Sequence, residues 1–253
     1  MFEIEEKTIK KLIDNNWLEI KTSFEDEGAD FIEVMFLKTF CDVNNLSLTL
    51  KVGGCEAIRD FKDANKLQIK KIVAPMIESA FGLEKFIKSS EKFYTVKNSK
   101  ISINVESKQC VQNIEEILSS SMISKLSNIT IGRGDLVQSY GMDRYTGSVD
   151  SKKIYEIAKN VFTLARQKKL GCTLGGSMSA NSKEFVSSLV NEHILDKFET
   201  RNVIVNVEAL KVIEFDEIIK AALNFELRYL NFKKNYYNTL YTQDELRIKK
   251  LSV

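Results

Sequence analysis

Two short β-branched segments of this 253-residue chain each lead to a carboxylate. Residues 101–105 precede Glu106, and residues 128–131 lead through Gly-Arg-Gly to Asp135. About 29 residues separate the two acids, which is the spacing of successive strands in a β/α repeat. Because the carboxyl ends of neighbouring parallel strands converge, the pair is a candidate site for an oxygen-seeking cation such as Mg2+. Two unrelated, solvated acids at strand ends are the alternative.

Two neighbours of these acids could contact a substrate. Asn104 lies two positions before Glu106 on the same strand, so both side chains point to the same face. Gly134 directly precedes Asp135, and a residue without a side chain lets a metal or a substrate approach the backbone. A simple turn would also explain the glycine.

Paired glycines follow two of the predicted strands and precede predicted helices. Gly53 and Gly54 come shortly after Lys51, and Gly175 and Gly176 follow a later strand. Free backbone N–H groups and the helix dipole make such a turn a candidate cradle for an anionic group, although tight turns explain paired glycines equally well. Lys51 ends a strand of alternating pattern and is a candidate fixed cation of the site.

The segments that must position these residues alternate between strand-like and helix-like patterns. Period-two runs bounded by turn residues predict seven strands, and apolar residues at helical spacing predict the helices between them. The predicted strands are residues 17–23, 46–52, 71–76, 101–105, 128–131, 171–174 and 201–207. The predicted helices are residues 1–16, 29–44, 55–67, 80–89, 111–120, 151–168, 183–193 and 215–232 or beyond.

Alternation at this interval indicates parallel strands joined by crossover helices. The predicted fold class is therefore α/β, with a (β/α)8 TIM-type barrel over residues 1–207 and a C-terminal helical extension over residues 208–253. Seven strands are one short of a closed barrel, so an open doubly wound sheet is the alternative. The glycine-containing segment 132–147 is predicted as a loop.

The composition argues against nucleic-acid and membrane proteins. The 37 Lys and Arg residues nearly balance the 35 Asp and Glu residues, so the net charge of +2 indicates no attraction to nucleic acid or to a membrane surface. No apolar run of about 18 residues exists, and the N-terminus lacks a signal-peptide pattern. The four cysteines form no Cys-x-x-Cys pair, and free thiols fit a cytoplasmic location.

The single histidine, His193, limits the available mechanisms. A Ser-His-Asp triad would have to use it. It ends residues 185–193, whose apolar spacing is helical, so we expect a helix-surface or core histidine.

Four segments of the chain together form a recognisable pattern. They are Leu50-Lys-Val-Gly-Gly-Cys-Glu-Ala, Val73-Ala-Pro-Met-Ile-Glu-Ser79, the strand ending at Glu106, and Ile131-Gly-Arg-Gly-Asp-Leu136 with Gly141. This pattern resembles the HpcH/HpaI aldolase and citrate lyase beta subunit family. Their order and spacing match over roughly residues 46–180, and the Gly-x-x-Asp-Leu signature is the most specific part.

The resemblance implies a barrel like those of the phosphoenolpyruvate/pyruvate superfamily and a carbon–carbon lyase or aldolase that acts through a metal-stabilised enolate. It implies that Glu106 and Asp135 bind Mg2+ or Mn2+, and that Lys51 occupies the position of a substrate-binding arginine. The expected substrate is a small keto or hydroxy acid or an acyl-CoA thioester. The residues expected to contact it are Asn104, Gly134, Gly175 and Gly176.

The chain departs from the family pattern in two ways. Lys51 offers a point charge where arginine offers a bidentate fork, and the early-strand histidine of the family's hydroxy-keto acid aldolases has only carboxylates in its place. The candidates for the general acid or base are therefore Glu25, Glu27, Glu78 and a metal-bound water. The residues expected to be catalytic are Lys51 and Glu78.

Several other functions stay open at this point. A Schiff base on Lys51 would leave the paired carboxylates without a role, and phosphoenolpyruvate-type chemistry would require a phosphate site. The alternative from another class is a catalytically inactive barrel that binds a metabolite or a protein partner.

The last helix carries more apolar side chains than one stripe on a barrel can bury. The residues expected to face the barrel are Leu223, Leu227 and Leu230, and those expected on an adjoining face are Tyr229, Phe232 and Tyr236. Large exposed aromatic patches are rare on monomers, so a homo-oligomer is predicted. Packing of both faces within one subunit is the alternative.

Overall fold

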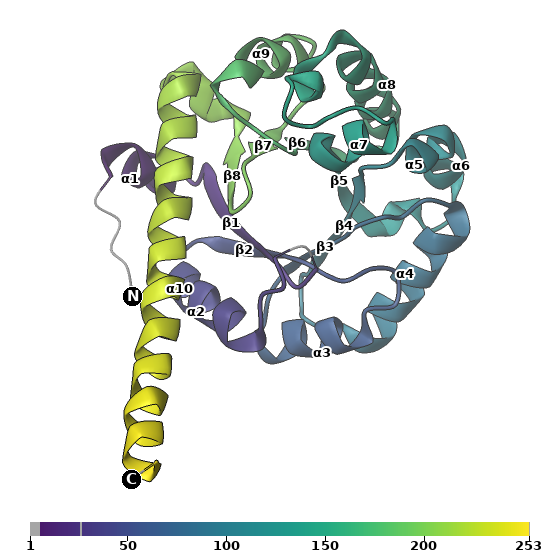
Figure 1. Ribbon diagram of the computed structural model, residues 1–253. Helices are drawn as coiled ribbons and strands as arrows, with labels where there is room; N and C mark the ends of the chain where they lie inside the picture. Colours follow the sequence, from purple (N-terminus) through teal and green to yellow (C-terminus); the bar gives the residue numbers. More distant parts are fainter. Residues whose placement is uncertain (1–5, 26, 253) are drawn as a thin grey trace.

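Eight strands close into a barrel in the order in which they occur in the sequence (Figure 1). The computed structural model describes residues 6–25 and 27–252. The strands are β1 (Leu18–Ser23), β2 (Ser47–Lys51), β3 (Lys71–Ala74), β4 (Lys100–Val105), β5 (Leu126–Gly132), β6 (Gly171–Gly175), β7 (Lys197–Glu199) and β8 (Val203–Asn206). The predicted TIM-type barrel is confirmed, and the open sheet is excluded.

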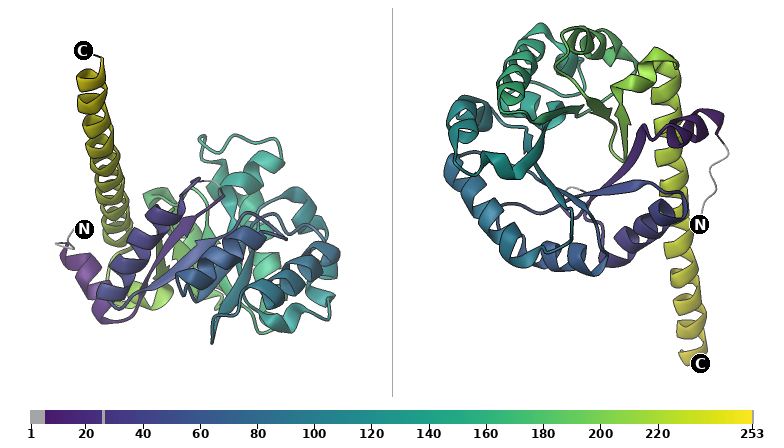
Figure 2. Two further views of the ribbon diagram at one scale, coloured as in Figure 1. Left: turned by 90° about the horizontal axis from the view of Figure 1, so that it is seen from below. Right: turned by 180° about the vertical axis from the view of Figure 1, so that it is seen from behind.

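Helices surround the barrel on its outside (Figures 1 and 2). The α-helices are α1 (Lys7–Asp14), α2 (Phe31–Val43), α3 (Ile58–Lys66), α4 (Ala80–Phe93), α5 (Lys108–Gln112), α6 (Ile114–Ser119), α7 (Arg133–Ser139), α8 (Lys152–Gln167), α9 (Lys183–Asn191) and α10 (Phe215–Leu251). Short 3-10 helices are η1 (Ile123–Lys125), η2 (Ser148–Asp150), η3 (Ala180–Ser182) and η4 (Val207–Lys211). The segment after β5, predicted as a loop, instead begins with helix α7.

The expectation that every strand is parallel is wrong where the barrel closes. β7 is three residues long, too short for an alternating pattern, so the sequence gives little sign of it. The chain turns from β7 directly into β8, which runs antiparallel to both β7 and β1. Since β7 is parallel to β6, the turn at residues 200–202 lies at the carboxyl end of the parallel strands.

Alternate residues of the strands face the helices or the barrel axis, and the two sets differ in chemistry. Helix-facing residues such as Ile20, Leu50 and Ile103 are fully buried and apolar. Barrel interiors are usually filled with Val, Ile and Leu, but most inward residues here are polar. They include Glu19, Lys21, Thr49, Lys51, Lys71, Ser102, Asn104, Asn128, Thr130, Thr173, Lys197 and Glu199. The interior therefore encloses two cavities with polar and charged residues in their linings, one where the strands end and one where they begin.

Helix α10 packs along α2 and then projects beyond the barrel (Figure 2). The Phe36 ring contacts those of Phe232 and Tyr236, with centroids 5.5 and 5.3 Å apart. The predicted assignment of the two faces is therefore reversed, because the aromatic stripe is the one that meets α2. The aliphatic stripe is exposed, with Leu227 58% and Leu230 57% accessible.

The division at residues 207 and 208 stays a prediction. β8 ends at Asn206, and the Thr8 hydroxyl of α1 donates to Glu217 of α10 at 2.5 Å, so α1 packs against the first turns of α10 beside the barrel. Among the described residues, no helix combines the length and apolar character needed to cross a membrane.

Candidate active site

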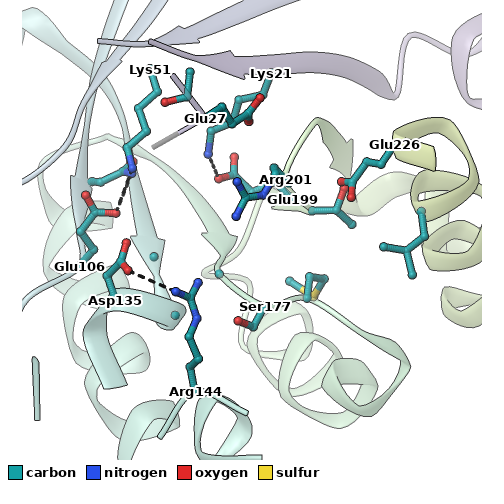
Figure 3. A pocket seen from close by; sticks show the side chains of 18 of the residues that line it. Lys21, Glu27, Lys51, Glu106, Asp135, Arg144, Ser177, Glu199, Arg201 and Glu226 are labelled. Carbon is teal, nitrogen blue, oxygen red and sulfur yellow. Dashed lines mark hydrogen bonds and ion pairs between the residues drawn. The ribbon is translucent and has the colours of Figure 1, made fainter. Parts of the chain in front are cut away.

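A cavity of about 330 Å3 opens at the carboxyl ends of the strands (Figure 3). Strand ends, the first turn of α7, the β7–β8 turn and α10 all contribute to its wall. Its charged lining residues are Lys21, Glu27, Lys51, Glu106, Asp135, Arg144, Glu199, Arg201 and Glu226. Both signs of charge in so small a space favour a small polar ligand over an apolar one.

Lys51 and Glu106 approach each other from the ends of β2 and β4, the strands that flank β3. The Lys51 Nζ atom lies 3.8 Å from Glu106 Oε2 and 2.8 Å from Glu25 Oε2. The Asn104 Nδ2 group donates to Glu106 Oε2 at 3.0 Å, as the two-residue spacing predicted. Lys51, Asn104 and Glu106 are all buried, so these interactions are stronger than they would be in water.

The second oxygen of Glu106 is an acceptor that the described part of the chain leaves unsatisfied. Glu106 Oε1 and Asn104 Oδ1 are both buried without a hydrogen-bond partner there. Burial raises the pKa of Glu106 above its ordinary value, and the positive charge of Lys51 offsets only part of this effect. A buried acceptor without a partner is destabilising, so this corner of the cavity favours a cation or a hydrogen-bond donor.

Asp135 faces the same space as Glu106 from the first turn of α7 (Figure 3). Its negative charge contributes to raising the pKa of Glu106, so the two carboxylates interact electrostatically. The Asp135 side chain is 40% exposed, and its Oδ1 atom lies 3.9 Å from Arg144 Nη1. The two carboxylates expected from the strand spacing therefore lie together.

Close backbone packing at this site requires glycine at two positions. A Cβ atom at Gly132 would lie 2.7 Å from Glu106 Oε2. Gly176 has φ +80°, and a Cβ atom there would lie 2.3 Å from the backbone nitrogen of Arg133. Gly176 lets the β6–η3 connection touch the β5–α7 connection, and Gly132 leaves room for the Glu106 carboxylate. Gly134 and Gly176 also line the cavity.

The buried Arg133 side chain links the β5–α7 connection to the β6–η3 connection. It is completely buried, donates from Nε to the Gly175 carbonyl at 3.1 Å and from Nη2 to the Ser182 hydroxyl at 3.2 Å, and forms an ion pair with Asp150. Burial lowers the pKa of Arg133, while Asp150 favours its charged form. Arg133 thus positions the neighbouring Asp135 without lining the cavity.

The opposite wall contains residues that the sequence analysis did not identify. Lys21 forms an ion pair with Glu199, the last residue of β7. Asn202 joins three segments, because its backbone N–H donates to Glu226 at 3.0 Å and its side chain donates to Glu27 at 3.2 Å. The available signal for Lys21 was the same-face spacing of Glu19, Lys21 and Ser23 on a strand whose other face carries the apolar Leu18 and Ile20.

Three residues considered earlier lie apart from the cavity lining. Glu78 does not line the cavity that holds Lys51, and its carboxylate accepts a hydrogen bond from the Ser107 hydroxyl. Gly175 accepts from Arg133 through its carbonyl and lies just behind the wall. His193 is exposed just beyond the end of α9 and does not line the cavity.

The residues present fit a divalent cation bound mainly by oxygen. Glu106 and Asp135 offer carboxylates, and the unsatisfied oxygens of Glu106 and Asn104 lie beside them. Within residues 6–25 and 27–252, no group of three or more His, Cys, Asp or Glu side chains forms a complete cage. Mg2+ commonly takes one or two carboxylates and leaves its other positions to water and substrate, so two ligands are compatible with it.

Comparisons with known proteins agree with the barrel fold. Citrate synthase SbnG has a TM-score of 0.61 and 13% identity over 76% of this chain and 80% of its own. An HpcH/HpaI aldolase from Desulfitobacterium hafniense DCB-2 has a TM-score of 0.61 and 13% identity over 80% of this chain and 83% of its own. A lead(II) complex of Haloferax volcanii malate synthase has a TM-score of 0.56 and 10% identity over 75% of this chain and 61% of its own.

At these identities the solved structures establish the barrel fold alone, and no curated protein shows a significant sequence match. A family model matches residues 43–185, more than half of the chain, and this segment includes Lys51, Glu106 and Asp135. The chain therefore belongs to the HpcH/HpaI aldolase/citrate lyase family, a membership that supports a lyase-type enzyme.

Proposed function

We propose that this protein is a divalent-metal-dependent carbon–carbon lyase or aldolase that acts on a small keto or hydroxy acid, or on an acyl-CoA thioester, through an enolate. The observation that carries the proposal is the corner formed by Glu106 and Asp135. There two carboxylates face one cavity beside the buried cation Lys51, and Glu106 presents an unsatisfied oxygen. The family is generally dependent on a divalent metal, which agrees with this donor set.

Glu106 and Asp135 would hold Mg2+ or Mn2+, with Asn104 beside them. The bound cation would act as a Lewis acid toward the oxygen on which charge develops when a carbon–carbon bond breaks. Lys51 would place a fixed positive charge next to the same oxygen, in a buried setting where its effect is little screened. Its ion pair with Glu25 keeps the ammonium group oriented toward the cavity.

The cations at the rim would bind the acid groups of the substrate. Arg144 and Arg201 line the cavity on different segments, and arginine matches a carboxylate through two parallel hydrogen bonds. Gly134 and Gly176 would let the substrate approach the backbone between them. Glu25, which contacts Lys51, and Glu27, which lines the cavity, are the proposed acid or base.

A lyase screen combined with calorimetry tests this proposal. Wild-type protein should cleave one of a panel of short keto acids, hydroxy acids or acyl-CoA thioesters only when Mg2+ or Mn2+ is added. Glu106→Gln and Asp135→Asn should lose both metal binding and turnover while keeping the wild-type unfolding temperature. Glu56→Gln is the matched control, because Glu56 is an exposed carboxylate whose one ion pair among the described residues is with the surface residue Lys85. Unchanged Mg2+ affinity in both active-site variants would contradict the metal site.

The alternative of a catalytically inactive barrel rests on two observations, the lysine at position 51 and a cavity without histidine. Metal binding with no turnover across the panel would favour that alternative. The free thiols of the four cysteines support the proposed cytoplasmic location. The exposed aliphatic stripe of α10 supports the proposed homo-oligomer.

A further inference from the structure

A second cavity, of about 200 Å3, lies at the opposite end of the barrel, where the strands begin. Lys71, Lys100 and Lys197 line it, and each is the first residue of its strand, in β3, β4 and β7. Because these strands are all parallel, their first residues meet at one mouth of the barrel. Three ammonium groups therefore surround a single polar cavity.

One carboxylate inside this cavity is shared between two of the lysines. Glu19 Oε2 lies 2.8 Å from Lys71 Nζ, and Glu19 Oε1 lies 2.6 Å from Lys197 Nζ. Within the described residues, Lys100 forms no ion pair with any carboxylate. One negative charge thus faces three positive charges.

The other acidic residues in the lining have partners of their own. Asp196 accepts from Arg166 at 2.6 Å and from the backbone N–H of Cys172 at 2.8 Å. Glu199 forms its ion pair with Lys21, which lines the cavity at the carboxyl ends of the strands, called the catalytic cavity below. Neither carboxylate offsets the excess of lysine charge at the mouth.

The crowding of positive charge affects how these groups titrate. Burial lowers the pKa of Lys71, and the nearby charges of Lys197 and Lys100 lower it further, against the opposing effect of Glu19. Burial alone would raise the pKa of Glu19, but the two lysines outweigh it and the pKa is lowered. The site is thus short of negative charge.

Neutral hydrogen-bonding groups complete the cavity wall. Asn128 donates to the Thr130 hydroxyl at 3.2 Å and accepts from the Thr173 hydroxyl at 3.2 Å. The Thr130 hydroxyl therefore keeps its own proton for another acceptor. The side chains of Lys71 and Lys197 are 21% and 29% exposed, so a solute can reach them from the solvent.

We infer that this amino-terminal cavity is a second binding site, separate from the catalytic one, for a small polyvalent oxyanion of the inorganic phosphate class. Three lysines and one glutamate leave two positive charges uncompensated, which matches a dianion. Partly buried cations without a counter-charge are unfavourable, so an anion that binds there stabilises the barrel. Glu199 lines both cavities, so the anion would lie directly beneath the Lys21–Glu199 pair.

Calorimetric titration with inorganic phosphate at constant ionic strength tests the site. Lys100→Met should weaken phosphate binding about tenfold, because one of the three charges is lost at an exposed position that forms no ion pair within residues 6–25 and 27–252. Glu19→Gln should tighten binding by a similar factor, since it removes the competing carboxylate. Lys70→Met is the matched control, because Lys70 is the exposed neighbour of Lys71 and lies outside the cavity lining. The phosphate affinity of this variant should equal that of the wild type.

A second control separates the two cavities. Arg144→Gln changes a cation of the catalytic cavity only and should leave phosphate affinity at the wild-type value. Thermal unfolding of each variant establishes that it is folded, and Lys197→Met provides a second lysine variant. The inference is overturned if Lys100→Met and Lys197→Met both bind phosphate like the wild type, or if Arg144→Gln abolishes binding.

Discussion

Replacing Gly132 with alanine should disable the proposed metal site while the barrel stays folded. The new Cβ atom would lie 2.7 Å from Glu106 Oε2, whereas ordinary van der Waals contact begins at 3.4 Å, so the carboxylate must withdraw by about 0.7 Å. Gly132 has φ −92° and ψ 85°, angles without the positive φ that alanine disfavours, so the effect is steric. Overpacking of this kind typically costs about 1–3 kcal/mol, which a closed barrel of this size can tolerate.

The Glu106 carboxylate has little freedom to absorb this displacement. The Asn104 Nδ2 group donates to Glu106 Oε2 at 3.0 Å, and Lys51 Nζ lies 3.8 Å from the same oxygen. A misplacement of about 1 Å can cost on the order of 100-fold in rate, so we expect turnover to fall about 10- to 100-fold. Mg2+ affinity should fall with it, because the same oxygen atoms are displaced.

Gly82→Ala is the matched control for this experiment. Gly82 lies in the first turns of α4, where an added Cβ atom would lie 3.4 Å from Ser79 Oγ and 3.6 Å from Cys55 Sγ, both ordinary contacts. Alanine should there be neutral or stabilising by up to about 1 kcal/mol. Calorimetry with Mg2+, turnover and thermal unfolding are measured for both variants. Wild-type metal affinity and turnover in Gly132→Ala, or equal losses in Gly82→Ala, would refute the reasoning.

Three further predictions concern other parts of the molecule. Borohydride added during turnover should leave the protein mass unchanged, because Lys51 is held in ion pairs with two carboxylates and acts as a fixed cation; a reduced adduct on Lys51 would overturn this role. Glu19→Gln should lower the free energy of unfolding at pH 7 by about 1–3 kcal/mol, because Lys71 and Lys197 lose their partner. Because folding lowers the pKa of Glu19, the stability that its carboxylate contributes is complete above its unfolded pKa of about 4.3 and is lost as the pH falls through its folded pKa. The denaturant unfolding curves of the wild type and of Glu19→Gln should therefore converge in acid. Leu227→Glu combined with Leu230→Glu should turn an oligomer into a folded monomer in light scattering, because both side chains are more than half exposed on α10; a monomeric wild-type protein at micromolar concentration would contradict the prediction.

The sequence predicts most of this fold because apolar and polar residues alternate along strands such as β1 and β2. The run at residues 46–52 is one example, and the structure has β2 at Ser47–Lys51. β7 escapes notice because three residues cannot display a period. The faces of α10 are assigned in reverse because Leu227 and Tyr229 belong to adjoining stripes of one helix, and only the tertiary contact with Phe36 on α2 decides which stripe is buried.

The convergence of Glu106, Asp135 and Lys51 follows from a simple rule about the ends of parallel strands. The rest of the site depends on features that such a rule does not cover. Glu199 reaches the cavity from the strand that the pattern misses. Arg133 resembles any solvated surface arginine until its partners, distant in the sequence, enclose it in the folded protein.

The antiparallel closing strand has a consequence for how the protein is made. β8 joins the barrel by pairing residues 203–205 with residues 18–20, contacts between nearly opposite ends of the chain. During synthesis, the backbone N–H and C=O groups on the outer edge of β1 cannot pair until β8 has left the ribosome. Contacts at such large sequence separation form slowly, and open sheet edges invite pairing with other chains. The nascent protein therefore passes through a stage in which an unclosed sheet is vulnerable to aggregation, and chaperone dependence should be concentrated at that stage.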